Sequence, residues 1–200
     1  MAEPTSKVLD ALSRSGLLLQ QDKKLPSVVT LVAGESLSTS WWGHPKGRII
    51  FKVLSELSHH PDVLFAKLLH QKVTLVHRKL WPALLAAISV DEPWQLNGLS
   101  PSARTLLAEA RESGAPVRGS GKAVKEIELR LLAHAEEVHT ESGRHETALE
   151  PWSTWSRRAG VKPMASPLLG RQEIEKVVKA IGAPSSALPW PPALQDSNPK

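Results

Sequence analysis

The chain has 200 residues, 41% of them hydrophobic and 22% charged, and its formal net charge is +5. It contains no cysteine, which excludes disulfides, thiolate catalysis and cysteine-based zinc sites. No run approaches the roughly 20 apolar residues of a membrane helix, and the first residues lack the apolar segment of a signal peptide. We therefore expect a cytoplasmic protein with no membrane partner, whose basic excess favours an acidic partner such as nucleic acid.

Apolar spacing and helix-end residues predict four helices in the first half of the chain. They cover about residues 6–13, 28–33, 46–57 and 82–88, and the third has the clearest apolar stripe. The β-branched residues of the second leave a strand as the alternative there. Between the first two helices, Leu17-Leu18-Leu19 is a short strand or a buried turn.

A hairpin is predicted directly after the third helix. The β-rich segment 63–79 carries a polar turn at His70-Gln71, which places Leu68 opposite Val73. A helix followed by a basic hairpin is the layout of a winged-helix module, in which a β wing flanks a helix docked on DNA. A helix packed against any small hairpin has the same order, so this layout alone does not identify the module.

The second half repeats this order. It predicts a helix over residues 102–113 capped by Ser100, a helix over 122–134, and a last helix over 171–181. Between the last two helices, Ser142-Gly143 is a typical two-residue hairpin turn. We therefore expect a second unit built of helix, loop, helix and hairpin.

Together these elements predict a mainly α protein with small β-hairpins, of the α+β class, built as tandem winged-helix-like units. The final residues are rich in Pro and Ser, a composition typical of a disordered tail. The expected division is 1–98 for the first unit with its basic hairpin, 99–160 for the second unit, 161–182 for a C-terminal helix and 183–200 for the tail.

The basic residues are concentrated in the central segment 40–87. It holds seven Lys and Arg against two acidic residues, an excess equal to the net charge of the whole chain. Clustered cations beside Trp and His are typical of a surface that neutralises phosphates, although a solvated basic face is the ordinary alternative. The predicted nucleic-acid contacts are Lys46, Arg48, Lys52, Lys67, Lys72, Arg78, Lys79, Lys122, Lys125 and Arg130.

The second hairpin concentrates imidazole and carboxylate groups in the segment HTESGRHE. Such groups can bind a metal or act in acid–base catalysis. However, the predicted register pairs His139 with Glu146 and points His139 and His145 to opposite faces, so we expect no metal and no other cofactor. The alternatives are a polar wing satisfied by cross-strand pairs and a wing that contacts nucleic acid. The residues of this candidate wing site are His139, Glu141, His145 and Glu146.

Two tryptophan pairs are candidates for either binding or packing. Trp41 and Trp42 can stack on a base, but large apolar rings more often pack in a core or between domains. Trp152 and Trp155 lie three residues apart, and we expect them to dock a short helix. A protein-interaction module that uses the Trp-rich faces is therefore an alternative function.

The chain resembles a family of uncharacterised bacterial winged-helix proteins over about residues 25–160, in the segments SWWGHPKGR, LLHQKVTLVHRKLWPALLA, EPWQLNGLSPSARTLLAEARESG and AEEVHTESGRHETALEPW. That family is distantly similar to the AlkZ-type crosslink-repair DNA glycosylases, which carry tandem winged helices. The similarity rests on the order of an apolar hairpin, a Leu-x-Pro-Ala-Leu helix, a Leu-Ser-Pro helix and a wing. The resemblance implies a winged-helix architecture and a nucleic-acid setting, with a link to DNA repair.

The Gln-x-Gln catalytic motif of those glycosylases is absent from this chain, so no catalytic residue is carried over from them. We expect a nucleic-acid-binding protein, with DNA as the expected partner. One alternative is an enzyme related to DNA glycosylases or nucleases, with its site around His139–Glu146. The other is the protein-interaction module.

Overall fold

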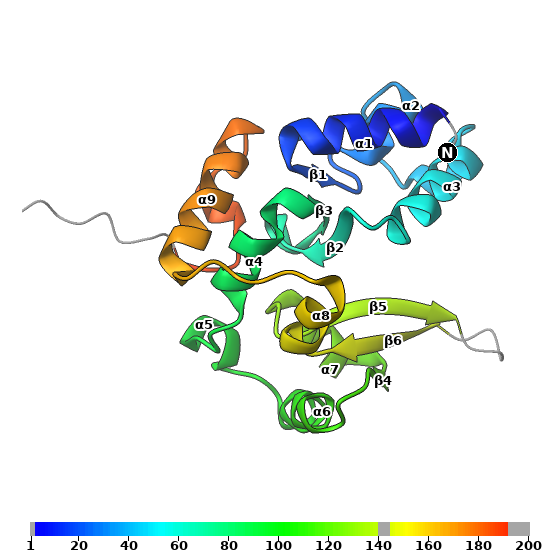
Figure 1. Cartoon of the computed structure of the whole chain (residues 1–200). Helices are drawn as coiled ribbons and strands as arrows, with labels where there is room; N and C mark the ends of the chain where they lie inside the picture. The colour runs from blue at the N-terminus through cyan, green and yellow to red at the C-terminus, as the bar shows by residue number, and fades with distance from the viewer. Residues whose placement is uncertain (1–2, 140–144, 192–200) are drawn as a thin grey trace, which may run out of the picture. The chain divides into compact units, whose positions relative to one another are not determined.

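The computed structural model describes residues 3–139 and 145–191 (Figure 1). Within these ranges it has nine α-helices and two three-stranded antiparallel sheets, which confirms the expected mainly α fold with small β-hairpins. None of the helices in this part of the chain has both the length and the apolar character needed to cross a bilayer. The chain divides into two compact units, Met1–Trp81 with Glu173–Leu188, and Pro82–Gln172 with Pro189–Lys200. The first unit thus ends before the expected boundary at 98 and takes a segment from near the C-terminus.

The first unit combines three helices with a small sheet whose strand order is β1-β3-β2. Helices α1, α2 and α3 contact one another, and α3 precedes the β2–β3 hairpin. Its elements are α1 (Glu3–Ser15), β1 (Leu17–Leu19), α2 (Val28–Ala33), η1 (Trp41–Gly43), α3 (Gly47–Ser58), β2 (Val63–Lys67), η2 (Leu69–Gln71), β3 (Val73–His77), η3 (Arg78–Leu80) and η4 (Ser185–Ala187).

The predicted apolar stripe of α3 forms the centre of this unit. Ile50, Val53 and Leu57 are fully buried and join Leu18 and Leu75 of the sheet in one core. Burial of such side chains contributes about 1.5–3 kcal/mol each. This packing decides which face of α3 remains in solvent.

The first hairpin differs from its predicted register by one residue, since Lys67 rather than Leu68 pairs with Val73. The cause is the turn. Lys72 N donates to Leu69 O at 2.8 Å, and both residues between them, His70 and Gln71, have left-handed φ values of 50° and 58°. The loop is therefore longer than a two-residue turn between paired strands. Because side chains alternate along a strand, the shift places the side chains of β2 on the face opposite to the one predicted relative to β3.

Replacing His70-Gln71 by Asn-Gly should stabilise the first unit by about 1 kcal/mol, because asparagine and glycine adopt left-handed φ more readily than histidine and glutamine. Asn-Gly is the pair preferred where both central turn residues have positive φ. Urea denaturation of the wild type and the variant measures the change. Gln71→Gly alone is the control and should give about half of the gain. A lower free energy of unfolding in the double variant would contradict this account.

The second unit also combines helices with a three-stranded sheet, in the order β4-β6-β5. Leu107, Val124, Ile127 and Leu149 lie in its core. Its elements are α4 (Trp81–Ile88), α5 (Pro93–Leu96), α6 (Pro101–Glu112), β4 (Val117–Gly119), α7 (Gly121–Leu129), β5 (His134–His139), β6 (His145–Glu150), α8 (Trp152–Ala159) and α9 (Pro167–Ala180), the last of which continues into the first unit.

The second hairpin is also shifted by one residue from its predicted register. His139 pairs with His145, and Val138 pairs with Glu146. The register follows from Ala135 opposite Leu149, because Leu149 is fully buried and a shift would turn it outward. The predicted turn at Ser142-Gly143 lies outside the described residues.

Two helix ends differ from the predictions. The helix predicted over 122–134 ends at Leu129, because Leu131 has a φ of 51° that interrupts a helix, and β5 then begins at His134. The last helix begins at Pro167, four residues before its predicted start at Arg171. The first difference lengthens the connection to the second hairpin, and the second shortens the loop between α8 and α9.

The beginning of the expected disordered tail is ordered in the structure. Residues 183–191 include η4, and Leu188 and Trp190 are buried. Trp190 stacks edge-on against Trp94 at 6.3 Å, within the second unit. The Pro and Ser content led to the prediction of disorder, although this segment also contains the apolar residues Leu188 and Trp190. Residues 192–200 lie outside the described residues.

Candidate nucleic-acid interface

The net charge of the protein is carried entirely by the first unit. That unit holds 13 Lys and Arg against 8 Asp and Glu, whereas the second holds 12 of each. Net charge therefore favours the first unit over the second as the part that a polyanion would approach. The surface of the first unit that exposes these cations is therefore the candidate interface.

The outer face of α3 presents cations to solvent. Arg48, Phe51, Lys52 and Ser55 follow the helical spacing of three and four residues, and all four are exposed. Arg48 makes no ion pair with any described residue. Lys52 lies 4.0 Å from Glu56, a long surface contact that contributes little.

The acidic residue of α3 is turned away from this face. Glu56 is partly buried, and it accepts a 2.6 Å hydrogen bond from the buried Thr5 hydroxyl of α1. The Glu56 carboxylate is therefore bound to α1, and the charged side chains of the outer face of α3 are Arg48 and Lys52.

A pair of tryptophans precedes α3, and the structure gives each a different place. Trp41 is 5% exposed and belongs to the core, while Trp42 is 65% exposed. Their rings stack with centroids 4.1 Å apart, and the Trp42 ring lies 5.6 Å from Phe51. Phe51 itself is 53% exposed. Phe51 was not predicted as a site residue. Its position opposite the apolar stripe of α3 could have indicated an exposed aromatic side chain.

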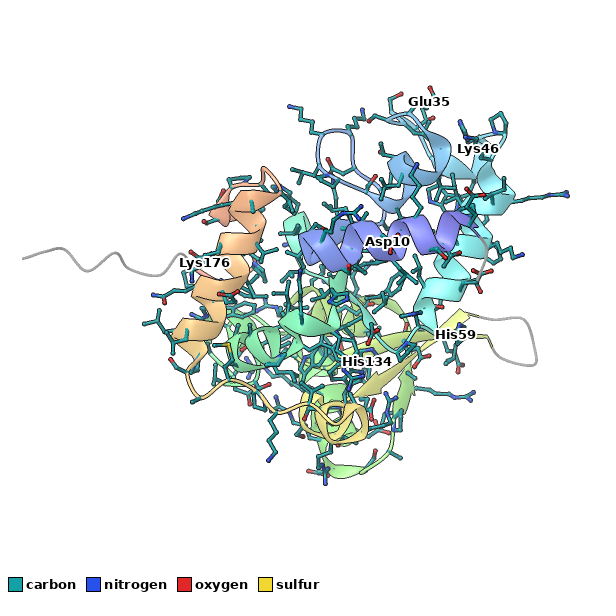
Figure 2. All side chains as sticks on the ribbon, turned by 45° about the horizontal axis from the view of Figure 1, so that its top comes forward. Asp10, Glu35, Lys46, His59, His134 and Lys176 are labelled. Atoms are coloured by element: carbon teal, nitrogen blue, oxygen red, sulfur yellow. The ribbon has the colours of Figure 1, made fainter. Side chains whose placement is uncertain are left out.

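Three of the predicted phosphate contacts bind helix C-termini instead. Lys46 Nζ donates to Ala33 O at 2.8 Å at the end of α2. The side chain of Lys46 is labelled in Figure 2. Lys79 Nζ donates to Arg14 O at 3.1 Å at the end of α1. Arg130 donates through Nη1 to three carbonyls around the end of α5, the shortest being Asn97 O at 2.6 Å. Cations in these positions satisfy the last carbonyls of a helix, so these three are less available to a ligand.

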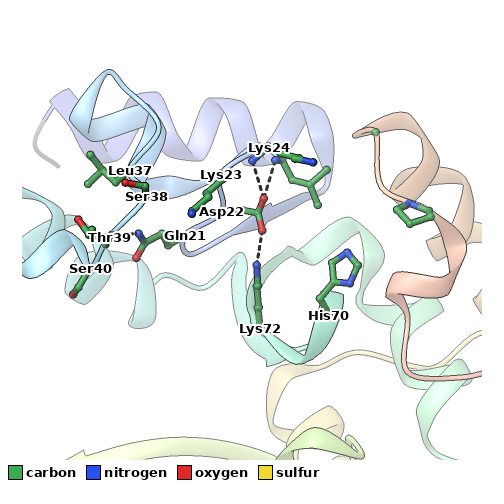
Figure 3. Close-up of a pocket in the computed structure, with 13 residues that line it drawn as sticks. Gln21, Asp22, Lys23, Lys24, Leu37, Ser38, Thr39, Ser40, His70 and Lys72 are labelled. Atoms are coloured by element: carbon green, nitrogen blue, oxygen red, sulfur yellow. Dashed lines mark hydrogen bonds and ion pairs between the residues drawn. The ribbon is translucent and has the colours of Figure 1, made fainter.

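Lys72 is occupied by an ion pair. Its Nζ lies 2.7 Å from Asp22 Oδ2, and the other oxygen of Asp22 accepts from the backbone N of Lys24 and of Leu25 (Figure 3). Burial alone would raise the pKa of Asp22, but the hydrogen bond from Lys72 and those from the backbone lower it to about 2. The tip of the first hairpin is thus tied to the loop that follows β1.

This contact forms one wall of a groove of about 840 Å³ within the first unit. Lys23 and Lys24 line it together with His70 and Lys72, opposite the hydroxyls of residues 38–40 (Figure 3). The groove was not predicted from the sequence, because its walls come from four separate segments of the chain. Asp22, the acidic residue that lines the groove, is already paired with Lys72.

The other predicted contacts are dispersed. Arg78 lies 3.9 Å from Asp62 and packs over the ring of Trp81 at 5.4 Å. Lys67 is partly buried at the end of β2. Lys122 and Lys125 are exposed on α7, in the unit that carries no net charge. The structure therefore does not bring the ten predicted residues together on one surface.

The candidate wing site of the second hairpin is only partly described. Glu146 lies 3.7 Å from Arg118 of the neighbouring strand, which is a cross-strand ion pair. Glu141 and the side chains of His139 and His145 lie outside the described part of the structure. Among the residues that are described, no group of three or more His, Asp or Glu side chains could hold a metal ion.

A second cluster of titratable groups, which the sequence analysis missed, surrounds His134. Its ring contacts Trp152 and Trp155 at centroid distances of 5.7 and 5.6 Å, and its backbone pairs with Glu150. Glu150 is buried and bound by Arg158 at 2.6 and 3.2 Å. Burial lowers the pKa of His134 to about 4, more than the nearby Glu150 raises it. These hydrophobic surroundings favour the neutral imidazole. We therefore interpret His134 as a residue that packs against Trp152 and Trp155 rather than as a catalytic group.

Searches against protein-family models, curated proteins and solved structures find no match for this chain. The resemblance to winged-helix repair proteins therefore stays a prediction.

Proposed function

We propose that the first unit binds nucleic acid, with DNA as the expected partner, through the outer face of α3. The observation that carries this proposal is the pair Arg48 and Lys52 on an exposed helix face, in the unit that holds the whole net charge of +5. In helix-based DNA recognition, one helix lies in the major groove and its outer residues reach the bases. The place of α3 before a hairpin supports the same role.

Electrostatics supports this surface over the others. Arg48 and Lys52 extend into solvent, whereas Lys46, Lys72 and Lys79 are held by carbonyls or by a carboxylate. Each phosphate that a cation neutralises releases counterions, so affinity falls as salt rises. A cation that is already paired within the protein contributes less to the binding free energy, because it must give up its partner to contact a phosphate.

The test is the charge reversal Arg48→Glu with Lys52→Glu. Fluorescence anisotropy with a labelled DNA duplex at 50 and 200 mM salt measures affinity and its salt dependence. We expect the double variant to bind about 10- to 100-fold more weakly than wild type at low salt and to show a shallower salt slope, by about 2 units.

The matched control reverses two exposed cations of the second unit, Lys122→Glu with Lys125→Glu. This variant changes the net charge by the same amount, and we expect its affinity to stay within about threefold of wild type, because only long-range screened attraction changes. Equal losses in both double variants would contradict an α3 interface. Undetectable binding by the wild type to both duplex and single-stranded DNA at low salt would reject the function.

A further inference from the structure

We infer that the exposed ring of Trp42 stacks on an unpaired base, so that nucleic acids with single-stranded or unstacked segments are the preferred ligands of the α3 face. This inference rests on the proposed function and names the kind of nucleic acid that it concerns. Four observations support it: the exposure of the ring, the support beneath it, the rigidity of its backbone and the charges beside it.

The ring is both exposed and held in place. Trp42 is 65% exposed, yet one face of it stacks on the buried Trp41 at 4.1 Å with only 23° between the planes. The Phe51 ring of α3 lies tilted at 39° to the Trp42 ring, with the two centroids 5.6 Å apart. A large exposed apolar side chain costs solubility and is typical of a binding surface. Its fixed orientation means that little side-chain freedom is lost when a ligand stacks on it.

The backbone around the ring is equally constrained. His44 N donates to Trp41 O at 3.0 Å, and Gly47 N donates to His44 O at 2.7 Å. A Cβ atom at Gly47 would lie 3.0 Å from Trp42 O and 3.1 Å from Trp41 O, so α3 begins directly against this turn. His44 also lies 3.2 Å from Glu35, which ties the turn to the loop after α2. The tryptophan platform is thus fixed to the start of α3.

The charges next to the ring select the ligand. Arg48 and Lys52 share the outer face of α3 with Phe51, so an aromatic surface and two cations lie on one helix. Alternating aromatic and cationic side chains bind single strands, because rings stack on bases while cations follow the phosphates. In an intact duplex the faces of each base are covered by its neighbours, and stacking on Trp42 would require unstacking first. An unpaired base meets the ring without that cost.

Binding of three DNA ligands tests the inference. These are a labelled 15-nucleotide single strand, a fully paired duplex of the same sequence, and that duplex with a three-nucleotide bulge. We expect the wild type to bind the single strand and the bulged duplex about tenfold more tightly than the paired duplex. Trp42→Ala should abolish this preference while keeping the affinity for paired duplex within about twofold. Trp42→Phe should retain part of it.

Leu168→Ala is the control for removing an exposed apolar side chain, since Leu168 is 52% exposed and lies in the second unit. It should leave all three affinities unchanged. A preference that survives Trp42→Ala overturns the inference, as does an equal loss for all three ligands or a dimer of the free protein that depends on Trp42. In each of these cases, weak binding by Arg48→Glu with Lys52→Glu still supports the proposed function. The function itself fails only if the wild type binds none of the ligands or if both charge-reversal variants lose affinity equally.

Discussion

Gly170→Ala is expected to lower the free energy of unfolding by about 1–2 kcal/mol. Alanine normally favours a helix over glycine by about 1 kcal/mol, and Gly170 lies within α9. However, a Cβ atom there would lie 2.4 Å from Ala83 O and 3.0 Å from Ala86 Cβ of α4. The nearest atom belongs to backbone, so the clash is relieved only by moving one helix away from the other. Overpacking of this kind typically costs about 1–3 kcal/mol, and the gain in helix propensity does not offset it.

The measurement is urea denaturation followed by tryptophan fluorescence and by circular dichroism. Gly43→Ala is the matched control, because a Cβ atom at Gly43 has no neighbour within 4 Å. We expect that control to change the free energy of unfolding by less than about 0.5 kcal/mol. A neutral or stabilising Gly170→Ala would contradict the close approach of α9 to α4.

The second large effect is a loss of stability in acid that depends on His134. An ordinary histidine has a pKa of 6.5, whereas the pKa of His134 in the folded protein is about 4. Between these two pH values the unfolded chain binds more protons than the folded one, so the free energy of unfolding falls as pH falls. Above pH 6.5 both states hold a neutral imidazole, and this contribution is constant. The difference corresponds to at most about 3 kcal/mol, and we expect about 2 kcal/mol because the ring is partly exposed.

His134→Gln removes the titrating group while keeping a polar side chain at the start of β5. The free energy of unfolding, measured at pH 7.0, 5.5 and 4.5, should decline less in this variant than in wild type, by about 2 kcal/mol at the lowest pH. His59→Gln, at an exposed position after α3, is the control for replacing a histidine. Parallel decline in wild type and His134→Gln would show that other groups set the acid limit.

The sequence predicted those elements whose signals are local. The stripe of α3 and the Ser100 cap of α6, whose hydroxyl accepts from Ala103 N at 3.3 Å, depend only on neighbouring residues. Both hairpins were predicted, and both registers were wrong by one residue. The pairing in the first depends on left-handed residues at His70 and Gln71, which favour glycine or asparagine and give no sequence signal when other residues adopt them.

The candidate site was harder to predict than the fold, because it depends on which groups each long cationic side chain contacts in the folded protein. Nothing in the sequence distinguishes Arg48, which extends into solvent, from Lys46, whose Nζ binds the end of α2. Arg130 likewise belongs to a charged cluster in the sequence but binds the carbonyls around α5, more than thirty positions earlier. The sequence itself shows the excess of cations in residues 40–87. The selection among individual cations required the tertiary structure.

The first unit has a consequence for how the protein is made. It is discontinuous, because residues 1–81 are completed by residues 173–188 from near the end of the chain. Val177 approaches Gly16, and η4 contacts η2 at the tip of the first hairpin. During synthesis the α3 face therefore emerges from the ribosome long before the segment that completes its unit. An isolated fragment ending at Trp81 would leave apolar surface uncovered, so the binding unit is best produced as the whole chain.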